Sequence, residues 1–156
     1  MAVAAGACVG CGGEEWHAET YPARGRITIN GAAPAGAVVE LQATGEAADV
    51  RNSRPWAVVQ DDGSYTLSTY EIGDGAPAGE YAISIKWPPD VSKPSLADRL
   101  GNAYSNPSGS QWKATVSAGE NQLPLIEIVG AKVLSKEQAA TPRNAPPGPG
   151  MGGSNP

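Results

Sequence analysis

Short stretches of alternating apolar and polar residues, separated by turn-forming residues, recur between residues 26 and 129. Residues 80–87 are the clearest case, because the odd-numbered positions from Tyr81 to Trp87 are large and apolar while the even-numbered positions are small or charged. This period of two residues is typical of a strand with one buried face. The same pattern, complete or partial, predicts strands over residues 26–30, 37–41, 56–60, 64–68, 80–87, 112–116 and 123–129.

Turn signals join these stretches. Asn30-Gly31 and Asp61-Asp62-Gly63 contain residues that tolerate positive φ, and they favour tight hairpins. The 20 Gly and 14 Pro of the chain are too many for a helical bundle. We predict a single helical turn over residues 96–100, where Ser95 and Asp98 resemble a capping box with Asp in place of Glu. About six or seven short strands with such turns indicate an all-β, Greek-key β-sandwich.

Composition limits the core and the classes of partner. Hydrophobic residues make 40% of the chain, and because Phe is absent the bulk must come from four Trp, five Tyr and the aliphatic residues. The formal net charge of −5 repels phosphate backbones, so we expect no nucleic-acid binding. Apolar runs stay well short of the roughly 18 residues that a membrane-spanning helix needs. Residues 141–156 are rich in Pro and Gly and predict a disordered tail.

The N-terminal residues 1–11 are small and mostly apolar, and they carry no charged side chain. Export signals end in small residues before their cleavage point, and bacterial lipoprotein signals place a Cys directly after that point. Val9-Gly10-Cys11 has this order, and the two glycines after Cys11 would begin a flexible tether. We therefore predict that Cys11 is lipidated and that the protein is exported to the bacterial cell envelope. The lack of Arg or Lys before Cys11 is explained if the natural start lies upstream of Met1.

The pair Cys8 and Cys11 has other interpretations. A redox dithiol needs a helix N-terminus in a βαβ context, and the sequence has no such pattern. A zinc site needs about four ligands, whereas Cys8, Cys11 and His17 supply only three. A disulfide between the two cysteines would close a very short loop and stabilise little, and two idle thiols in a disordered leader are a further alternative. We favour lipidation of Cys11 and expect no cofactor and no metal.

Four motifs occur in an order that resembles one family. They are the stretches from Gly25 to Gly31, from Pro34 to Leu41, from Asp61 to Leu67 and from Ala78 to Ile85. Together they are similar to the carboxypeptidase regulatory-like, or transthyretin-like, β-sandwich domain over about residues 24–129. The pattern looks closest to small bacterial envelope lipoproteins, which also carry Cys-Gly-Gly after the leader. This resemblance implies a transthyretin-like sandwich and a non-catalytic module.

Catalytic and metal sites are not expected on the predicted sandwich. The only His is His17, which lies in the predicted tether, so a Ser-His-Asp triad cannot form within the sandwich. Asp61, Asp62 and Asp74 lie in two predicted turns, and calcium favours clustered oxygens. Asp is itself a turn former, however, and calcium takes about 6–8 oxygen ligands. We therefore interpret these acids as turn residues and the protein as a non-enzyme.

Aromatic side chains are the candidates for ligand binding. Trp87, Tyr104 and Trp112 flank the predicted connection of residues 88–110, and such side chains can form stacking platforms for sugars. The alternative is that they fill the core, because a chain without Phe needs the volume of Trp and Tyr. Alternation places Trp87 and Trp112 on inward faces, which favours core packing.

The sequence thus predicts three parts and one principal function. Residues 1–23 are a signal remnant and lipoprotein tether, residues 24–134 the β-sandwich, and residues 135–156 a disordered tail. The predicted function is a non-enzymatic envelope lipoprotein that presents a small structural or binding module. Its partners would be the membrane, through the lipid anchor, and an envelope protein or glycan. The alternative is a secreted carbohydrate- or protein-binding module without a lipid anchor.

Overall fold

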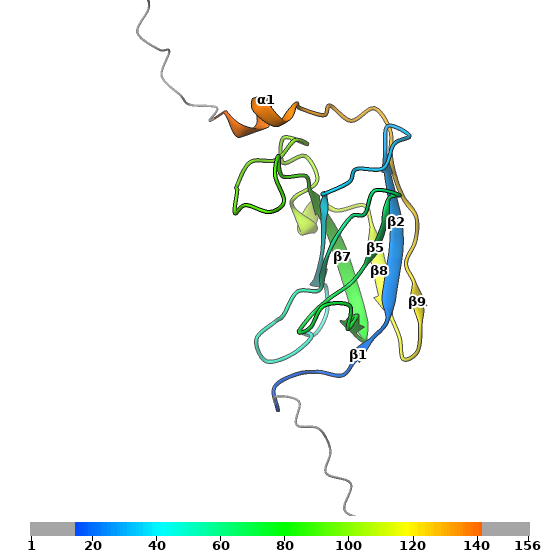
Figure 1. Ribbon diagram of the computed structural model, residues 1–156. Coiled ribbons are helices and arrows are strands. Elements are labelled where there is room, and N and C mark those ends of the chain that lie inside the picture. Colours follow the sequence, from blue (N-terminus) through cyan, green and yellow to red (C-terminus); the bar gives the residue numbers. More distant parts are fainter. Residues whose placement is uncertain (1–14, 142–156) are drawn as a thin grey trace, which may run out of the picture.

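The predicted all-β sandwich is confirmed. A computed structural model describes residues 15–141, and its strands form two four-stranded sheets and one small ladder (Figure 1). The first sheet contains β2 (Ala23–Ile29), β5 (Ser64–Thr66), β9 (Asn121–Gln122) and β10 (Ile126–Ile128). The second sheet has the order β4 (Trp56–Val58), β3 (Val38–Ala43), β7 (Gly79–Lys86), β8 (Lys113–Val116). The ladder pairs β1 (Thr20–Tyr21) with β6 (Ala76–Pro77).

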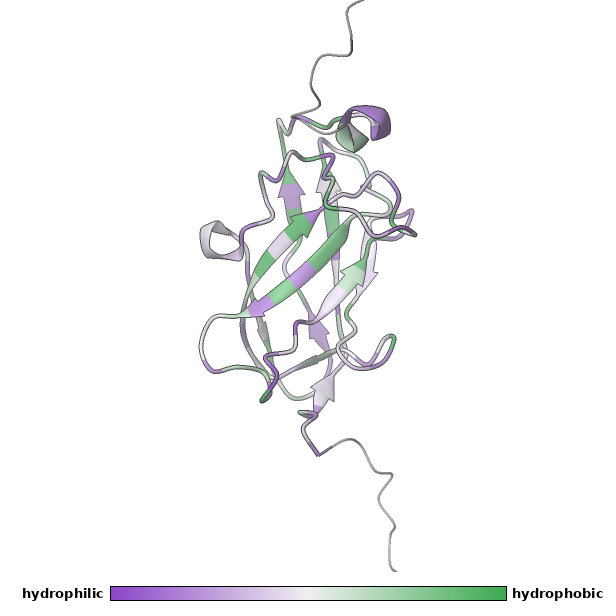
Figure 2. Cartoon of the chain, turned by 90° about the vertical axis from the view of Figure 1, so that its left-hand side faces the viewer, coloured by the Kyte–Doolittle hydropathy of each residue, from purple (hydrophilic) through white to green (hydrophobic). Residues whose placement is uncertain are grey.

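The predicted alternation forms the core between the sheets. In β2, every second residue from Ala23 to Ile29 is buried, and in β7 the side chains of Tyr81, Ile83 and Ile85 are buried. Figure 2 shows the resulting alternation of apolar and polar residues along the strands. The largest fully buried side chains include Tyr65 and Tyr81, so tyrosine does supply bulk in a chain that lacks Phe.

Tight turns connect the strands where the sequence predicts them. Asn30 and Gly31 have φ of 52° and 80°, and backbone hydrogen bonds join Ile29 and Ala32 in both directions around them. Gly63 has φ of 84° and donates its backbone N–H to the carbonyl of Gln60. Both turns therefore use the positive φ that the residue types allow.

The outer face of β7 is covered by a loop that the alternation does not reveal. Ala82 and Ser84 are 3% and 7% exposed although they point away from the core. The short 3-10 helix η1 (Pro107–Gly109) lies against β7, and Pro107 lines small hollows beside both residues. A segment between β7 and β8 thus folds back over the sheet.

The helical turn predicted over residues 96–100 is wrong. Residues 96–98 are irregular, a turn without helix begins at Arg99, and Leu96 is 93% exposed. Within residues 15–141, the Ser95 hydroxyl accepts only the nearby N–H of Ala97. Asp98 instead accepts a hydrogen bond from the backbone N–H of Trp87, 11 residues earlier, so its carboxylate ties two chain segments together rather than capping a helix.

Ordered structure extends beyond residues 24–134 on both sides. The ladder of β1 with β6 precedes β2 and is joined to it across Pro22. The short helix α1 (Lys136–Ala140) follows, and its capping box uses Ser135 and Gln138. In Figure 1, the N-terminal segment beside β1 and helix α1 lie at opposite ends of the sandwich.

Two buried tyrosines allow a matched test of the core. Both side chains are 1% exposed, but the Tyr81 hydroxyl donates to the Pro77 carbonyl at 2.8 Å, whereas the Tyr65 hydroxyl has no partner among the described residues. We expect Tyr81→Phe to lower the free energy of unfolding by about 1 kcal/mol, and Tyr65→Phe to leave it unchanged or raise it, because an unpaired buried hydroxyl is unfavourable. Urea unfolding measures both. Equal losses in the two variants would contradict this account of the core.

Candidate functional site

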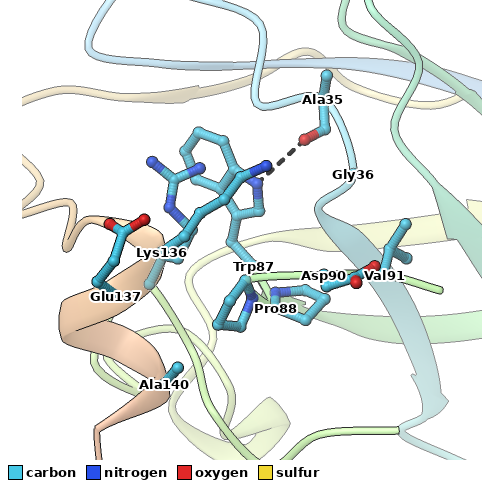
Figure 3. Close-up of a pocket in the computed structure, with 11 residues that line it drawn as sticks. Ala35, Gly36, Trp87, Pro88, Asp90, Val91, Lys136, Glu137 and Ala140 are labelled. Atoms are coloured by element: carbon cyan, nitrogen blue, oxygen red, sulfur yellow. Dashed lines mark hydrogen bonds between the residues drawn. The ribbon is translucent and has the colours of Figure 1, made fainter. Parts of the chain in front are cut away.

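A groove of about 620 Å³ lies at the end of the sandwich that carries α1. Its walls come from the turn before β3, from the segment that follows β7, and from α1 (Figure 3). The side chains with functional chemistry in these walls are Trp87, Asp90, Arg99, Lys136 and Glu137. The groove therefore combines an aromatic ring with both positive and negative charges.

Trp87 is fixed in place at the end of β7. Its indole Nε1 donates to the carbonyl of Ala35 at 3.1 Å, and its backbone N–H donates to Oδ1 of Asp98 at 2.9 Å. The ring is half-buried and packs partly against the core. Pro88 and Pro89 follow and end the strand, as the sequence predicts. The Nε1 edge of the Trp87 ring is thus hydrogen-bonded to the turn before β3, and the side chain lines the groove.

Arg99 lies over the Trp87 ring. Its guanidinium carbon is 4.0 Å from the ring centroid, which is the geometry of a cation–π contact. Its Nε donates to the Leu134 carbonyl at 2.9 Å, and its backbone exchanges two further hydrogen bonds, donating to Trp87 and accepting from Leu134. Arg99 is therefore held by both the strand end and the segment that leads to α1.

The two acids of the groove differ in their partners. Hydrogen bonds from Ser92 and Lys93 lower the pKa of Asp90 to about 2, and Oδ2 of Asp90 lies 3.1 Å from Nζ of Lys93. Glu137 has no ion pair among the described residues, and hydrogen bonds from its own backbone N–H and from Ser135 hold its pKa below the ordinary value. Asp90 is thus paired with a neighbouring cation, whereas Glu137 makes no ion pair within 4.0 Å among the described residues, and the nearby charges of Lys136 and Arg99 also help to lower its pKa.

Trp87, Tyr104 and Trp112 do not form one platform. The Tyr104 and Trp112 rings contact each other with centroids 5.6 Å apart and planes tilted by 55°. The backbone N–H groups of Ile85 and Ile83 donate to the carbonyls of Tyr104 and Trp112, respectively. Both residues therefore bond to the edge of β7 beyond the part that pairs with β8. Both are half-buried against the core and neither lines the groove at Trp87. Only Trp87 is combined with charged side chains in a cavity.

A second cluster, at the end where the N-terminal segment lies, was not predicted from the sequence. The His17 ring stacks on Tyr70 at 3.9 Å, Trp16 meets both rings edge-on, and the Arg51 guanidinium lies 3.8 Å from the centroid of the Trp16 ring. The Tyr70 hydroxyl donates to Asp49 at 2.6 Å and accepts from the backbone N–H of Ala18. A Trp-His pair in a predicted tether was the available signal, because a solvated linker has no need of aromatic residues.

Hydrogen bonds set the charge states in this N-terminal cluster. Burial alone would raise the pKa of Asp49, but hydrogen bonds from Tyr70, Ser53 and Arg51 outweigh it and lower that pKa to about 2. Burial and the bond to Asp49 together raise the pKa of Tyr70 to about 12. The contact is thus a neutral phenol donating to a carboxylate over the whole neutral range. It pins residues 16–18 to the sandwich.

The acids of the predicted turns are occupied by backbone groups. Asp62 accepts from the backbone N–H and hydroxyl of Ser64, and Asp74 accepts the N–H groups of Thr69, Tyr70 and Glu71. Within residues 15–141 there is no group of three or more His, Cys, Asp or Glu that could hold a metal ion. No helix in this part of the chain is long and apolar enough to cross a membrane.

Cys11, the predicted lipidation site, lies outside the described residues. Among the predicted ligand-binding residues, the structure therefore places Trp87 in the groove and Tyr104 with Trp112 beside β7. Arg99 and Lys136, which complete the groove, were not predicted. Comparison of the chain with protein-family models, with curated proteins and with solved structures gave no match.

Proposed function

We propose that this chain is a non-enzymatic lipoprotein of the bacterial cell envelope, anchored through a lipidated Cys11. The sandwich would be the rigid module that it presents, with the Trp87 groove as its binding site. We further propose membership of the carboxypeptidase regulatory-like, transthyretin-like family, supported by the sandwich fold and by the Asn30-Gly31 and Asp61–Gly63 turns in their expected order. Fold alone does not determine function, which depends here on the N-terminal segment and the groove at the two ends of the molecule.

The observation that supports anchoring is the docking of the N-terminal segment at the end of the sandwich away from α1 (Figure 1). Only residues 12–14 separate Cys11 from Glu15, the first described residue. Four extended residue steps span at most about 14 Å. Because Tyr70 pins the chain at residues 16–18, a lipid on Cys11 would keep this end of the sandwich close to the membrane. The groove would then face away from the membrane.

A non-enzymatic role is supported by the partners of the reactive groups. His17 is stacked on Tyr70 at the end far from the groove, and Asp49, Asp62 and Asp74 are hydrogen-bonded to turns and hydroxyls. Catalysis needs a nucleophile or metal beside a base, held in a cavity. The groove has Arg99, Lys136 and Glu137, a set suited to binding charged or polar ligands.

Fractionation of cells tests the anchor. We expect the protein to sediment with membranes and to be released by detergent, because a diacylglyceryl group has two acyl chains and anchors stably. Cys11→Ala should reduce the membrane-bound share at least about tenfold. Cys8→Ala is the matched control and should leave it unchanged. Equal membrane binding of Cys11→Ala and the unsubstituted protein would refute lipidation at Cys11.

A second candidate function is a secreted carbohydrate- or protein-binding module without a lipid. The groove favours it, since Trp87 and unpaired charges can bind a ligand without any anchor. In this case the unsubstituted protein and Cys11→Ala would both be found in the soluble fraction. The same fractionation thus separates the two proposals.

A further inference from the structure

We infer that the groove binds the carboxylate of an acidic carbohydrate, with Arg99 as the residue that holds it. The inference rests on the proposed binding function of the sandwich and does not depend on lipidation. The unused hydrogen-bond donors of the groove, its charge balance and the composition of its walls all favour such a ligand.

The guanidinium of Arg99 is held in place, but most of its N–H donors have no hydrogen-bond acceptor among the described residues. Its Nε–H bonds to Leu134 and one face of the guanidinium lies on Trp87, but its four terminal N–H bonds have no acceptor among the described residues. No carboxylate in residues 15–141 comes within 4.0 Å of the group. A guanidinium matches a carboxylate with two parallel hydrogen bonds. Because its position is already fixed, little side-chain freedom would be lost on binding.

The balance of unpaired charge in the groove is positive. Asp90 is paired with Lys93, so the remaining charges are Arg99 and Lys136 against Glu137. In Figure 3 the Lys136 side chain extends from α1 toward the side of the groove where Trp87 lies. The protein as a whole carries a net charge of −5, which makes this groove an exception to its overall charge. The groove therefore favours a negatively charged group on its ligand.

The walls favour a sugar over a peptide strand. Pro88 and Pro89 form part of the lining and have no N–H to donate. A peptide that adds to a sheet edge needs alternating backbone donors and acceptors, which this wall cannot supply. The proline rings and Trp87 instead offer apolar surface for the C–H faces of a sugar ring. A uronic acid has both features, an apolar ring face and a carboxylate.

Titration of the full chain with an oligogalacturonate tests the inference, with the indole N–H signal of Trp87 in NMR spectra as the readout. The fully methyl-esterified oligosaccharide has the same rings without the charge. We expect the acid to shift the Trp87 signal and to bind at least about tenfold more tightly than the ester, because a charge-assisted bidentate pair is lost in the ester. An acid and an ester that bind equally would overturn the role of the carboxylate.

Two variants test the residues. Arg99→Lys keeps the positive charge but cannot make the two parallel hydrogen bonds of a guanidinium to a carboxylate. We therefore expect at least about tenfold weaker binding. The Lys136 side chain makes no hydrogen bond or ion pair within residues 15–141, so Lys136→Gln should weaken binding about threefold while leaving unfolding unchanged. Lys132→Gln, at an exposed position outside the groove, is the matched control and should have no effect.

Three results would overturn the inference. They are no shift of the Trp87 signal at millimolar oligogalacturonate, unchanged binding by both Arg99→Lys and Lys136→Gln, and displacement of the oligosaccharide by an acidic peptide of equal charge at lower concentration. None of them bears on the anchor, because cell fractionation measures lipidation independently of the groove. Conversely, if the unsubstituted protein were found in the soluble fraction, the anchor would be refuted, but the NMR titration would still test ligand binding in the groove.

Discussion

Replacing Gly75 by alanine is expected to destabilise the protein by about 3–5 kcal/mol, or to detach β1 from the sandwich. Gly75 has φ of 92°, and a Cβ atom there would lie 1.9 Å from the Tyr21 carbonyl oxygen and 2.4 Å from its carbon. Both atoms belong to the backbone of β1, which pairs with β6 directly after Gly75. Neither chain can move without breaking this ladder, so the overlap cannot be relieved by a side-chain rotation.

Gly73→Ala is the matched control for this substitution. Gly73 has a similar φ of 79°, but nothing lies within 4 Å of a Cβ built there. Its substitution should therefore carry only the penalty of the left-handed conformation, about 1–2 kcal/mol. Urea unfolding gives both values, and hydrogen exchange at Thr20 and Tyr21 reports whether β1 stays paired. Equal destabilisation by the two alanines, with β1 still protected, would show that the contact with Tyr21 is not tight.

Asp98→Ala is expected to lower the free energy of unfolding by about 3 kcal/mol. Asp98 is buried, and its carboxylate accepts three backbone N–H groups, those of Trp87, Leu100 and Asn102. Alanine leaves all three without an acceptor, and the N–H of Leu100 among them is buried. Asp98→Asn keeps the oxygen that bonds Trp87 and Leu100 and loses the bond to Asn102, so it should cost about 1 kcal/mol.

The same pair of variants tests how the groove is held. Asp98 positions the backbone of Trp87, and the residue after Asp98 is Arg99, which lies over the Trp87 ring. We expect Asp98→Ala to move the indole N–H signal of Trp87 and to abolish the oligosaccharide response, and Asp98→Asn to keep both. Urea unfolding and the NMR titration measure the two effects separately. An Asp98→Ala protein with unchanged stability and an unchanged Trp87 signal would contradict the role given to this carboxylate.

The strands could be predicted because their pattern is local. In β2 and β7, neighbouring residues alternate between core and the opposite face, and the turns at Gly31 and Gly63 require residue types that permit positive φ. Asp98 is different, because its decisive contact is not local. Its spacing from Ser95 suggested a helix cap, but its partner is the N–H of Trp87, and local spacing does not encode that distant bond.

The candidate site was predicted in part, for a similar reason. Trp87 stood out as a large aromatic residue at the end of a strong strand, but so did Trp112, which lies against Tyr104 beside β7. Residue type alone does not distinguish a ring beside a cavity from a ring that fills space. Arg99 and Lys136 carry no local signal, since the groove forms only when α1 and the turn before β3 come together.

The proposed anchor is tested most directly by the intact mass and the N-terminal peptide of the native protein, isolated from membrane and soluble fractions. The account predicts a membrane-bound form that begins at Cys11 and carries the added mass of a diacylglyceryl group. An unmodified chain that retains residues 1–10 and stays in the soluble fraction would contradict it.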